Sequence, residues 1–369
     1  GVTNDSVTFS SLDADSVDFT TVPTEAQSAL VQGAGSTASI DPDFELPSDW
    51  RYQIAADYTF DIPKLGDNFA WTNELTYVDR QNAAYWEDLS RIDNGNSTVD
   101  GRIIWDNVYD GTEYEDNYDI QLTNSDDGGR SILFTSALAK QWDNGLSLNA
   151  SYTHQDITEV NPGTSSTAES NYQYEVTVNR NDPLVGTAYY EIKHRLVVNL
   201  GYTHQFFEGY NTNFNLFFER RSGQPFSWVL GSYQDDDLGD QSAFDDSDIY
   251  LPYIPSGAND SAVDFENGLS YDEIMAIAEA AGVAGSAGGY VDKYSSTQPW
   301  ITTVDLAISQ EIPGFVEGHK GRIYLNIDNF ANLLNDDWGK VYEMNYPQQI
   351  LFDYDINEFG TCSFCSINH

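Results

Sequence analysis

The segment WRYQIAADYTFD at residues 50–61 decides the fold of this chain, because apolar and polar residues alternate along almost its whole length. Side chains of a β-strand point to opposite faces with a period of two, so one face of this strand is apolar and the other is polar. A soluble antiparallel sheet alternates in the same way, so the pattern alone does not choose between water and lipid. The apolar face carries Trp50, Tyr52, Ile54, Ala56, Tyr58 and Phe60, and the other face mostly Arg51, Gln53, Asp57, Thr59 and Asp61.

Similar segments recur along the chain and are joined alternately by tight turns and long loops. Asp143-Asn144-Gly145 is typical of a hairpin turn. The other short connections lie at 62–67, 208–211 and 314–321. The long connections cover about 83–129, 157–187 and 223–298. The predicted strands lie near 48–61, 68–77, 130–142, 146–156, 196–206, 212–222, 300–312 and 322–334, with a ninth near 338–353.

The asymmetry of the connections indicates a membrane barrel rather than a β-sandwich. Outer-membrane barrels pair short periplasmic turns with long outer loops, whereas a sandwich would not make every second connection long. Each clear strand has about ten residues, the length that crosses a bilayer at a tilt. We therefore expect an all-β fold: a partial antiparallel transmembrane β-barrel of about 9–10 strands with long extracellular loops. Taken alone, such a sheet would have exposed edges, which lipid does not tolerate, so the remaining strands are expected to come from another segment or a partner.

Three regions are predicted along the chain: an acidic loop-like segment at 1–47, the barrel portion at 48–355 and an irregular tail at 356–369. Within the first long loop, Arg102–Trp105 and Tyr118–Leu122 look like the strands of a hairpin. The third long loop is expected to hold one short helix, because Ser270 and Glu273 have the spacing of a capping box and Gly282 can end it.

The composition is strongly acidic, with 16 Lys and Arg against 59 Asp and Glu and a formal charge of −43. Phosphate backbones require a basic surface, so the charge argues against nucleic acid as a partner. Most of the carboxylates are expected to be solvated. A few could hold divalent cations, which prefer oxygen ligands, where lipopolysaccharide lies beside the outer loops.

The third long loop also provides the candidate binding residues. An irregular oxygen cage for Ca²⁺ is one reading of its acidic run, and a solvated acidic loop is the other. The calcium candidates are Asp235, Asp236, Asp237 and Asp240. The candidate substrate contacts are Tyr233, Tyr250, Tyr253 and Tyr290. The tryptophans expected at the membrane interface are Trp50, Trp71, Trp142, Trp300 and Trp338.

No catalytic pattern is present, so we expect no enzyme and no cofactor apart from the calcium considered above. The five histidines form no H-E-x-x-H motif, and no G-x-S-x-G or phosphate loop occurs. His154 and His204 each follow Tyr-Thr, which indicates similar strand design rather than a metal pair. Cys362 and Cys365 have C-x-x-C spacing without the context of a redox or zinc site. No apolar run of 18 residues occurs, so no transmembrane helix is expected.

Three stretches, in this order, resemble one known family. Arg221-Ser222-Gly223-Gln224-Pro225-Phe226-Ser227 is the first. The second combines Pro299-Trp300, Asp305-Leu306 and Gln310-Glu311-Ile312-Pro313. The third combines Asn326-Ile327-Asp328-Asn329, Asn332-Leu333-Leu334-Asn335 and Trp338-Gly339. Over about 48–355 the chain resembles the carboxy-terminal barrel portion of TonB-dependent outer-membrane receptors of the Oar-like type.

This resemblance implies a large barrel in the outer membrane of a Gram-negative bacterium, an amino-terminal plug, and energy from an inner-membrane TonB complex. Members of the family close with an amphipathic strand that ends in an aromatic residue, whereas here Phe359 is followed by ten more residues. The plug and the TonB-contacting segment are not recognisable in this sequence, which is therefore expected to be a fragment or a processed piece.

Three functions follow as expectations. The first is the barrel portion of such a receptor, serving energised nutrient uptake or surface adhesion and secretion. The second is a small barrel that closes on itself and conducts passively. The third is a soluble extracellular β protein that binds calcium through its acidic loops. As the barrel portion of a receptor, the chain is expected to have as partners outer-membrane lipid and lipopolysaccharide, the missing plug and barrel strands, and the TonB complex.

Overall fold

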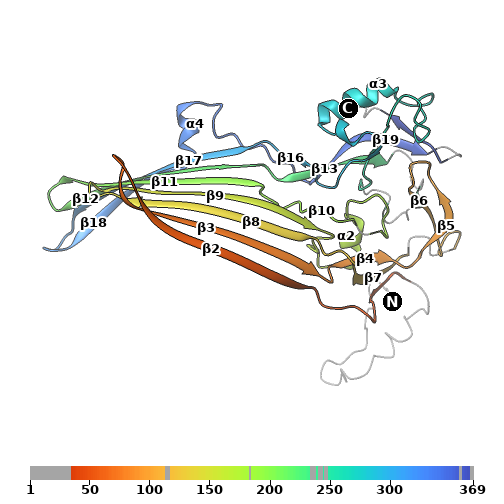
Figure 1. Ribbon diagram of the computed structural model, residues 1–369, viewed down its shortest axis with the longest axis horizontal. Coiled ribbons are helices and arrows are strands. Elements are labelled where there is room, and N and C mark those ends of the chain that lie inside the picture. The colour runs from red at the N-terminus through yellow and green to blue at the C-terminus, as the bar shows by residue number, and fades with distance from the viewer. Residues whose placement is uncertain are drawn as a thin grey trace, which may run out of the picture.

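The computed structural model describes residues 35–112, 117–182, 184–232, 238–239, 244, 248–356 and 360–365. Within these residues one large antiparallel sheet dominates, and its strands run side by side along the long axis of the molecule (Figure 1). Its strands are β2 (Ser48–Ile62), β3 (Gly66–Gln81), β8 (Arg130–Gln141), β9 (Leu146–Glu159), β11 (His194–Phe207), β12 (Tyr210–Arg221), β17 (Ile301–Pro313) and β18 (Lys320–Ile327). The order across the sheet is β18-β17-β12-β11-β9-β8-β3-β2, and the short β10 (Gly186–Thr187) pairs with β9. The fold is all-β.

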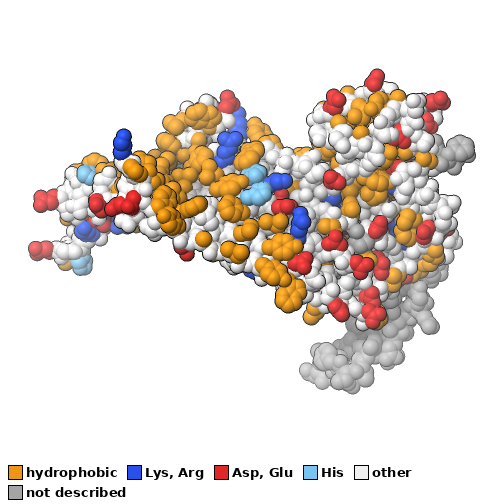
Figure 2. Space-filling view, in the orientation of Figure 1, with side chains coloured by type: hydrophobic (Ala, Val, Ile, Leu, Met, Phe, Trp, Pro, Cys, Tyr) orange, Lys and Arg blue, Asp and Glu red, His pale blue; other side chains and the backbone are white. Residues whose placement is uncertain are grey.

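The register of this sheet gathers the alternating apolar residues on one face. Leu148 lies opposite Leu200, which lies opposite Leu216, which in turn lies opposite Leu306. Apolar side chains of this face are exposed even in the edge strand, where Ile54 is 73% exposed. Figure 2 shows hydrophobic side chains across the middle of the sheet and acidic ones over both ends. A water-soluble sheet would bury this face against a second layer.

The opposite face of the sheet is polar and is held together by cross-strand hydrogen bonds. The Thr72 hydroxyl donates to Asp57 at 2.7 Å, and Thr203 donates to Asn213 at 2.9 Å. Asn213 in turn donates to the Ser309 hydroxyl at 3.2 Å. The large sheet is therefore amphipathic, with its two faces suited to different surroundings.

The long connections fold at one end of the sheet into small sheets with helices α2 and α3, an assembly that we call the loop-end cap (Figure 1). One sheet joins β1 (Thr37–Ile40), β4 (Ala84–Asp88) and β7 (Asp119–Asn124), and another joins β5 (Arg91–Ser97) and β6 (Ile103–Asn107). A third joins β13 (Pro225–Ser232), β16 (Ser296–Thr297), β19 (Gln348–Ile356) and β20 (Cys362–Cys365), and β14 (Tyr253–Ile254) pairs with β15 (Gly289–Tyr290). The helices are α2 (Ala168–Gln173), α3 (Tyr271–Ala281), a 3₁₀ turn (Ala284–Ser286) and, outside the cap beside β17, α4 (Phe330–Leu334).

The cap has a hydrophobic core of its own. Phe352 and Phe364 stack with ring centroids 5.1 Å apart, and both are almost completely buried. Ile274 of α3 and Ile254 of β14 belong to the same cluster. The cap is thus a packed body rather than a set of solvated loops, which explains how connections of this length keep a defined shape.

The predicted short helix is confirmed as α3. The Ser270 hydroxyl accepts the backbone N–H of Glu273, and the Glu273 carboxylate accepts the backbone N–H of Ser270 at 3.0 Å. Gly282 ends the helix in the left-handed region with φ of 77°. This conformation is unfavourable for residues with a Cβ, so the capping box and the glycine together fix both ends of α3.

Several other expectations are wrong. The predicted hairpin does not form: β6 pairs with β5, and β7 pairs with β1 and β4. The predicted ninth strand is β19, which pairs in parallel with β13 in the cap and does not join the large sheet. Strand β18 ends at Ile327 because Asn329 adopts a φ of 53° and turns the chain into α4. The single short helix that was expected is also wrong, because the described residues contain α2 and α4 besides α3. The segments expected to be irregular contain β1, which pairs with the distant β7, and β20, which pairs with the preceding strand β19.

The large sheet is open among the described residues, since β2 and β18 lie at opposite edges and do not pair with each other. A small barrel that closes on itself would require that pairing. In the part of the chain that the structure describes, no helix is long and apolar enough to cross a membrane.

Candidate functional site

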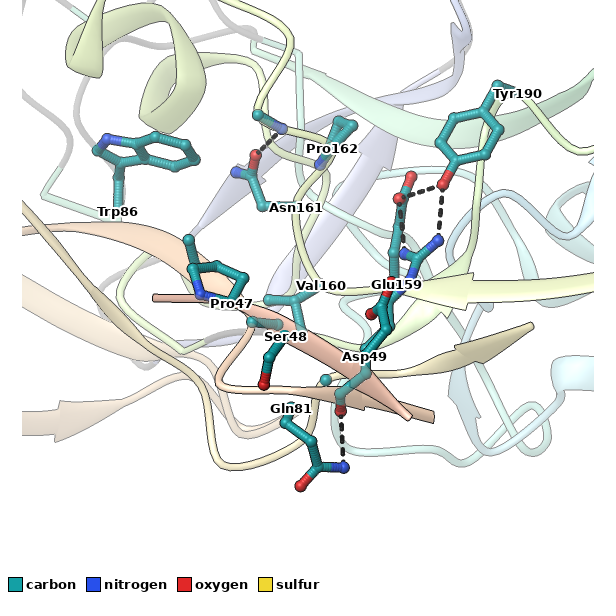
Figure 3. A pocket seen from close by; sticks show the side chains of 15 residues that line it. Pro47, Ser48, Asp49, Gln81, Trp86, Glu159, Val160, Asn161, Pro162 and Tyr190 are labelled. Carbon is teal, nitrogen blue, oxygen red and sulfur yellow. Dashed lines mark hydrogen bonds and ion pairs between the residues drawn. The ribbon is translucent and has the colours of Figure 1, made fainter. Parts of the chain in front are cut away.

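A hollow of about 420 Å³ opens where the large sheet meets the cap (Figure 3). Its walls come from the start of β2, the end of β3, the first residues of β4 and the segment after β9, and Tyr190 closes one side. The chain can approach closely here because Gly128 lies against β3: a Cβ at this position would come within 2.2 Å of the Arg80 carbonyl oxygen. The hollow therefore depends on residues that are distant in the sequence.

A closed triangle of hydrogen bonds forms one wall of this hollow. Arg80 donates from Nη1 to the Glu159 carboxylate at 3.2 Å and from Nη2 to the Tyr190 hydroxyl at 3.0 Å. The Tyr190 hydroxyl donates to Glu159 at 2.8 Å. Burial raises the pKa of Tyr190, and the charge of Glu159 adds to this effect against the opposing influence of Arg80. The tyrosine therefore keeps its proton and its role as a donor.

Trp86 and Asn161 form the opposite wall (Figure 3). The Asn161 side chain accepts the backbone N–H of Gly163 at 2.8 Å and donates to the carbonyl of Asn171 at 2.9 Å, so it fixes the loop after β9. An aromatic face opposite a charged, hydrogen-bonding wall can bind a polar ligand that also has an apolar surface.

The predicted Tyr250, Tyr253 and Tyr290 do not line this hollow. Arg102 lies 4.9 Å from the ring centre of Tyr290 and 5.9 Å from that of Tyr250, and Tyr253 packs edge-on against Tyr290 at 5.7 Å. Three of the four predicted residues are thus brought together, but Tyr250 is buried and its ring serves the internal packing of the cap. Tyr233 lies outside the described residues.

The predicted interface tryptophans lie at both ends of the large sheet. At the turn end, Trp71 donates to the Ser136 hydroxyl at 2.8 Å and Trp142 donates to the Leu65 carbonyl at 2.6 Å. At the cap end, Trp50 and Trp300 are about half exposed or more. Trp338 follows α4 and, with Trp300, lines a second hollow of about 500 Å³ on the apolar face.

The predicted calcium ligands Asp235, Asp236, Asp237 and Asp240 lie outside the described residues. Among the residues that are described, no group of three or more His, Cys, Asp and Glu side chains is placed to hold a metal. Cys362 is buried in the cap core, where its thiol packs with apolar side chains.

Two arrangements escaped the sequence reasoning. The first is the triangle of Arg80, Glu159 and Tyr190, which comes from three separate segments. The second is the direct contact of His154 with His194 across β9 and β11. His154 and His204, in contrast, are not partners: His204 lies opposite Thr212 and packs against Phe206. The histidine pair follows from the register between β9 and β11, and this register cannot be derived from the sequence.

No protein-family model and no curated protein sequence matches this chain. Among solved structures, the fold is similar to that of the outer membrane transporter YddB from Escherichia coli, with 11% sequence identity and a TM-score of 0.42. The match covers 91% of this chain and 33% of the transporter, so the chain spans about a third of the length of that protein.

Proposed function

We propose that this chain is a portion of the barrel wall of a TonB-dependent outer-membrane receptor of the Oar-like type, in a Gram-negative bacterium. The observation that carries the proposal is the exposed apolar face of the large sheet, which continues through the register from β2 to β18. Such a face is stable against lipid and costly against water. The polar face, with Asp57, Asn213 and Ser309, would line a wet lumen or contact a plug.

The orientation follows from the connections. The tight turns would lie in the periplasm and the cap outside the cell, as is usual for outer-membrane barrels. In this orientation the hollow beside Trp86 would face the medium and bind the substrate or an adhesion partner. Uptake would draw energy from the TonB complex, and lipopolysaccharide would surround the cap end.

A pair of adjacent substitutions in β11 tests the proposal. Leu200 lies on the apolar face and Asn199 on the polar face at the same depth in the sheet. We expect Leu200→Arg to cost about 2–4 kcal/mol and to reduce assembly into phospholipid vesicles, because a charge near the bilayer midplane is expensive. Asn199→Arg should assemble normally.

Assembly is measured by flotation of the full chain with vesicles. If the unmodified chain stays soluble and monomeric without detergent, or if both variants float equally well, the membrane proposal is wrong.

A further inference from the structure

His154 and His194 form an unusual pair on the apolar face, near the cap end of the large sheet. They lie directly opposite each other in neighbouring strands, and their ring centroids are 4.9 Å apart. Their Nδ1 atoms are only 3.4 Å apart, so the two ring edges that bear these nitrogens converge. Both side chains are half-buried, and solvent reaches the site.

Two oxygen atoms complete the same small region. The Tyr152 hydroxyl lies 2.8 Å from Nδ1 of His194, and the Lys193 carbonyl oxygen lies 3.0 Å from Nδ1 of His154. Each of the two Nδ1 atoms thus has the other Nδ1 atom and one oxygen atom as close neighbours. Trp300 stacks on His194 at 5.9 Å with the planes 8° apart, which restricts rotation of that imidazole.

The separation of the two Nδ1 atoms matches that of two ligands around a transition metal. Zinc–nitrogen bonds of about 2.0–2.1 Å place two ligands of a tetrahedral ion about 3.3–3.4 Å apart. Imidazole nitrogen suits zinc, copper and nickel, whereas calcium and magnesium prefer sites made of oxygen alone. The pair alone offers two imidazoles, and the phenol and the carbonyl oxygen offer the further donors that such an ion needs.

We propose that His154 and His194 bind a divalent transition metal, such as Zn²⁺, Cu²⁺ or Ni²⁺, through their Nδ1 atoms, with Tyr152 and the Lys193 carbonyl as additional oxygen donors. The ion would cross-link β9 to β11 close to the cap. This site is separate from the hollow beside Trp86 and does not depend on the membrane proposal, since the same geometry would bind metal in detergent, in lipid or in water.

The test measures binding of Zn²⁺ to the full chain by calorimetry, and the electron paramagnetic resonance spectrum of bound Cu²⁺. We expect one tight equivalent, with two nitrogen ligands in the copper spectrum. His154→Ala and His194→Ala should each weaken binding by about tenfold or more and reduce the nitrogen count to one, since even supporting partners of metal ligands are worth that much. His204→Ala is the matched control, because His204 lies on the same strand β11 with aromatic neighbours and should leave binding unchanged.

Circular dichroism of each variant shows whether it folds, and the conservative His154→Gln and His194→Gln substitutions replace any alanine variant that does not. Tyr152→Phe removes the phenol oxygen and should weaken binding while both nitrogens stay in the copper spectrum. Absence of tight binding, or binding that survives loss of either His154 or His194, would overturn the proposal. The second outcome would place the metal on other donors, such as the acidic loop.

Discussion

At the scale of single residues, one carboxylate of the cap holds a loop in place through its hydrogen bonds. This carboxylate belongs to Asp260. It accepts the backbone N–H groups of Ser256 at 2.7 Å and Ala262 at 3.0 Å, and the hydroxyls of Ser256 and Tyr253 at 2.8 and 3.1 Å. One side chain thus closes the loop that follows β14, and the tyrosine predicted to touch substrate is one of its partners.

The stability that the Asp260 carboxylate contributes depends on pH through its pKa. Burial acts to raise the pKa of Asp260, but the hydrogen bonds from Ser256, Ala262 and Tyr253 outweigh it and hold the pKa below the usual 3.8. A carboxyl with a lowered pKa in the folded state adds stability above its unfolded pKa and loses it as the pH falls through the folded value. We expect Asp260→Asn to destabilise the cap by about 1 kcal/mol at pH 7, through the hydrogen bonds it loses.

The measurement is thermal unfolding of the full chain at pH 7 and at a series of lower pH values. The difference between Asp260→Asn and the unmodified chain should shrink as the pH falls through the folded pKa of Asp260, which lies below 3.8. Asp336→Asn, at an exposed position beside α4, controls for the loss of one negative charge. A penalty that stays equal across the whole pH series would show that the charge of Asp260 contributes nothing.

At the scale of elements, local signals succeeded and long-range pairing failed. The eight long strands of the large sheet were predictable because the period-two alternation lies within each segment. Helix α3 was predictable because its capping box and its terminal glycine are local signals. The pairing of β7 with β1 and of β19 with β13 was not predictable, because partners lie about 80 and 120 residues away and neither strand has a turn signal toward its partner. The strand expected at 322–334 was too long because β18 ends before Asn329, which adopts the left-handed conformation. Asparagine is common in turns, so the residue type alone does not show that the strand ends here.

The capping box of α3 supports a prediction at this scale. Ser270→Ala removes the hydroxyl that accepts the N–H of Glu273, and we expect it to lower the stability of the cap by about 1 kcal/mol. Ser270→Thr keeps an acceptor at the same place and should cost much less. Chemical denaturation followed by the fluorescence of Trp228, which donates to the Ala281 carbonyl at the end of α3, reports the change. Equal loss in the alanine and threonine variants would show that packing, not capping, holds this end of the helix.

At the scale of the whole molecule, the sites depend on how the sheet is assembled. The hollow beside Trp86 needs β2, β3 and the loop after β9 to meet, and the histidine pair needs the register of β9 against β11. The sequence shows arginine, glutamate, tyrosine and histidine at these positions but not their proximity. The tyrosine candidates follow from their position in a long loop, and the core of the cap buries Tyr250.

The open edge of the sheet leads to the last prediction. Among the described residues, β2 has a partner only on its β3 side, and almost all of its residues are exposed, including Trp50 and Tyr58. Amides that face an unpaired edge exchange with solvent far faster than those bonded on both sides. In hydrogen-exchange mass spectrometry of the full chain in detergent, we expect the peptide covering Ser48–Ile62 to exchange well ahead of His194–Phe207, which lies between β9 and β12. Equal protection of the two peptides would mean that the edge is covered, either by a second copy of the chain or by closure onto β18, and the wall would then be complete without further strands. Dilution distinguishes these two cases, because protection that depends on chain concentration identifies a second copy.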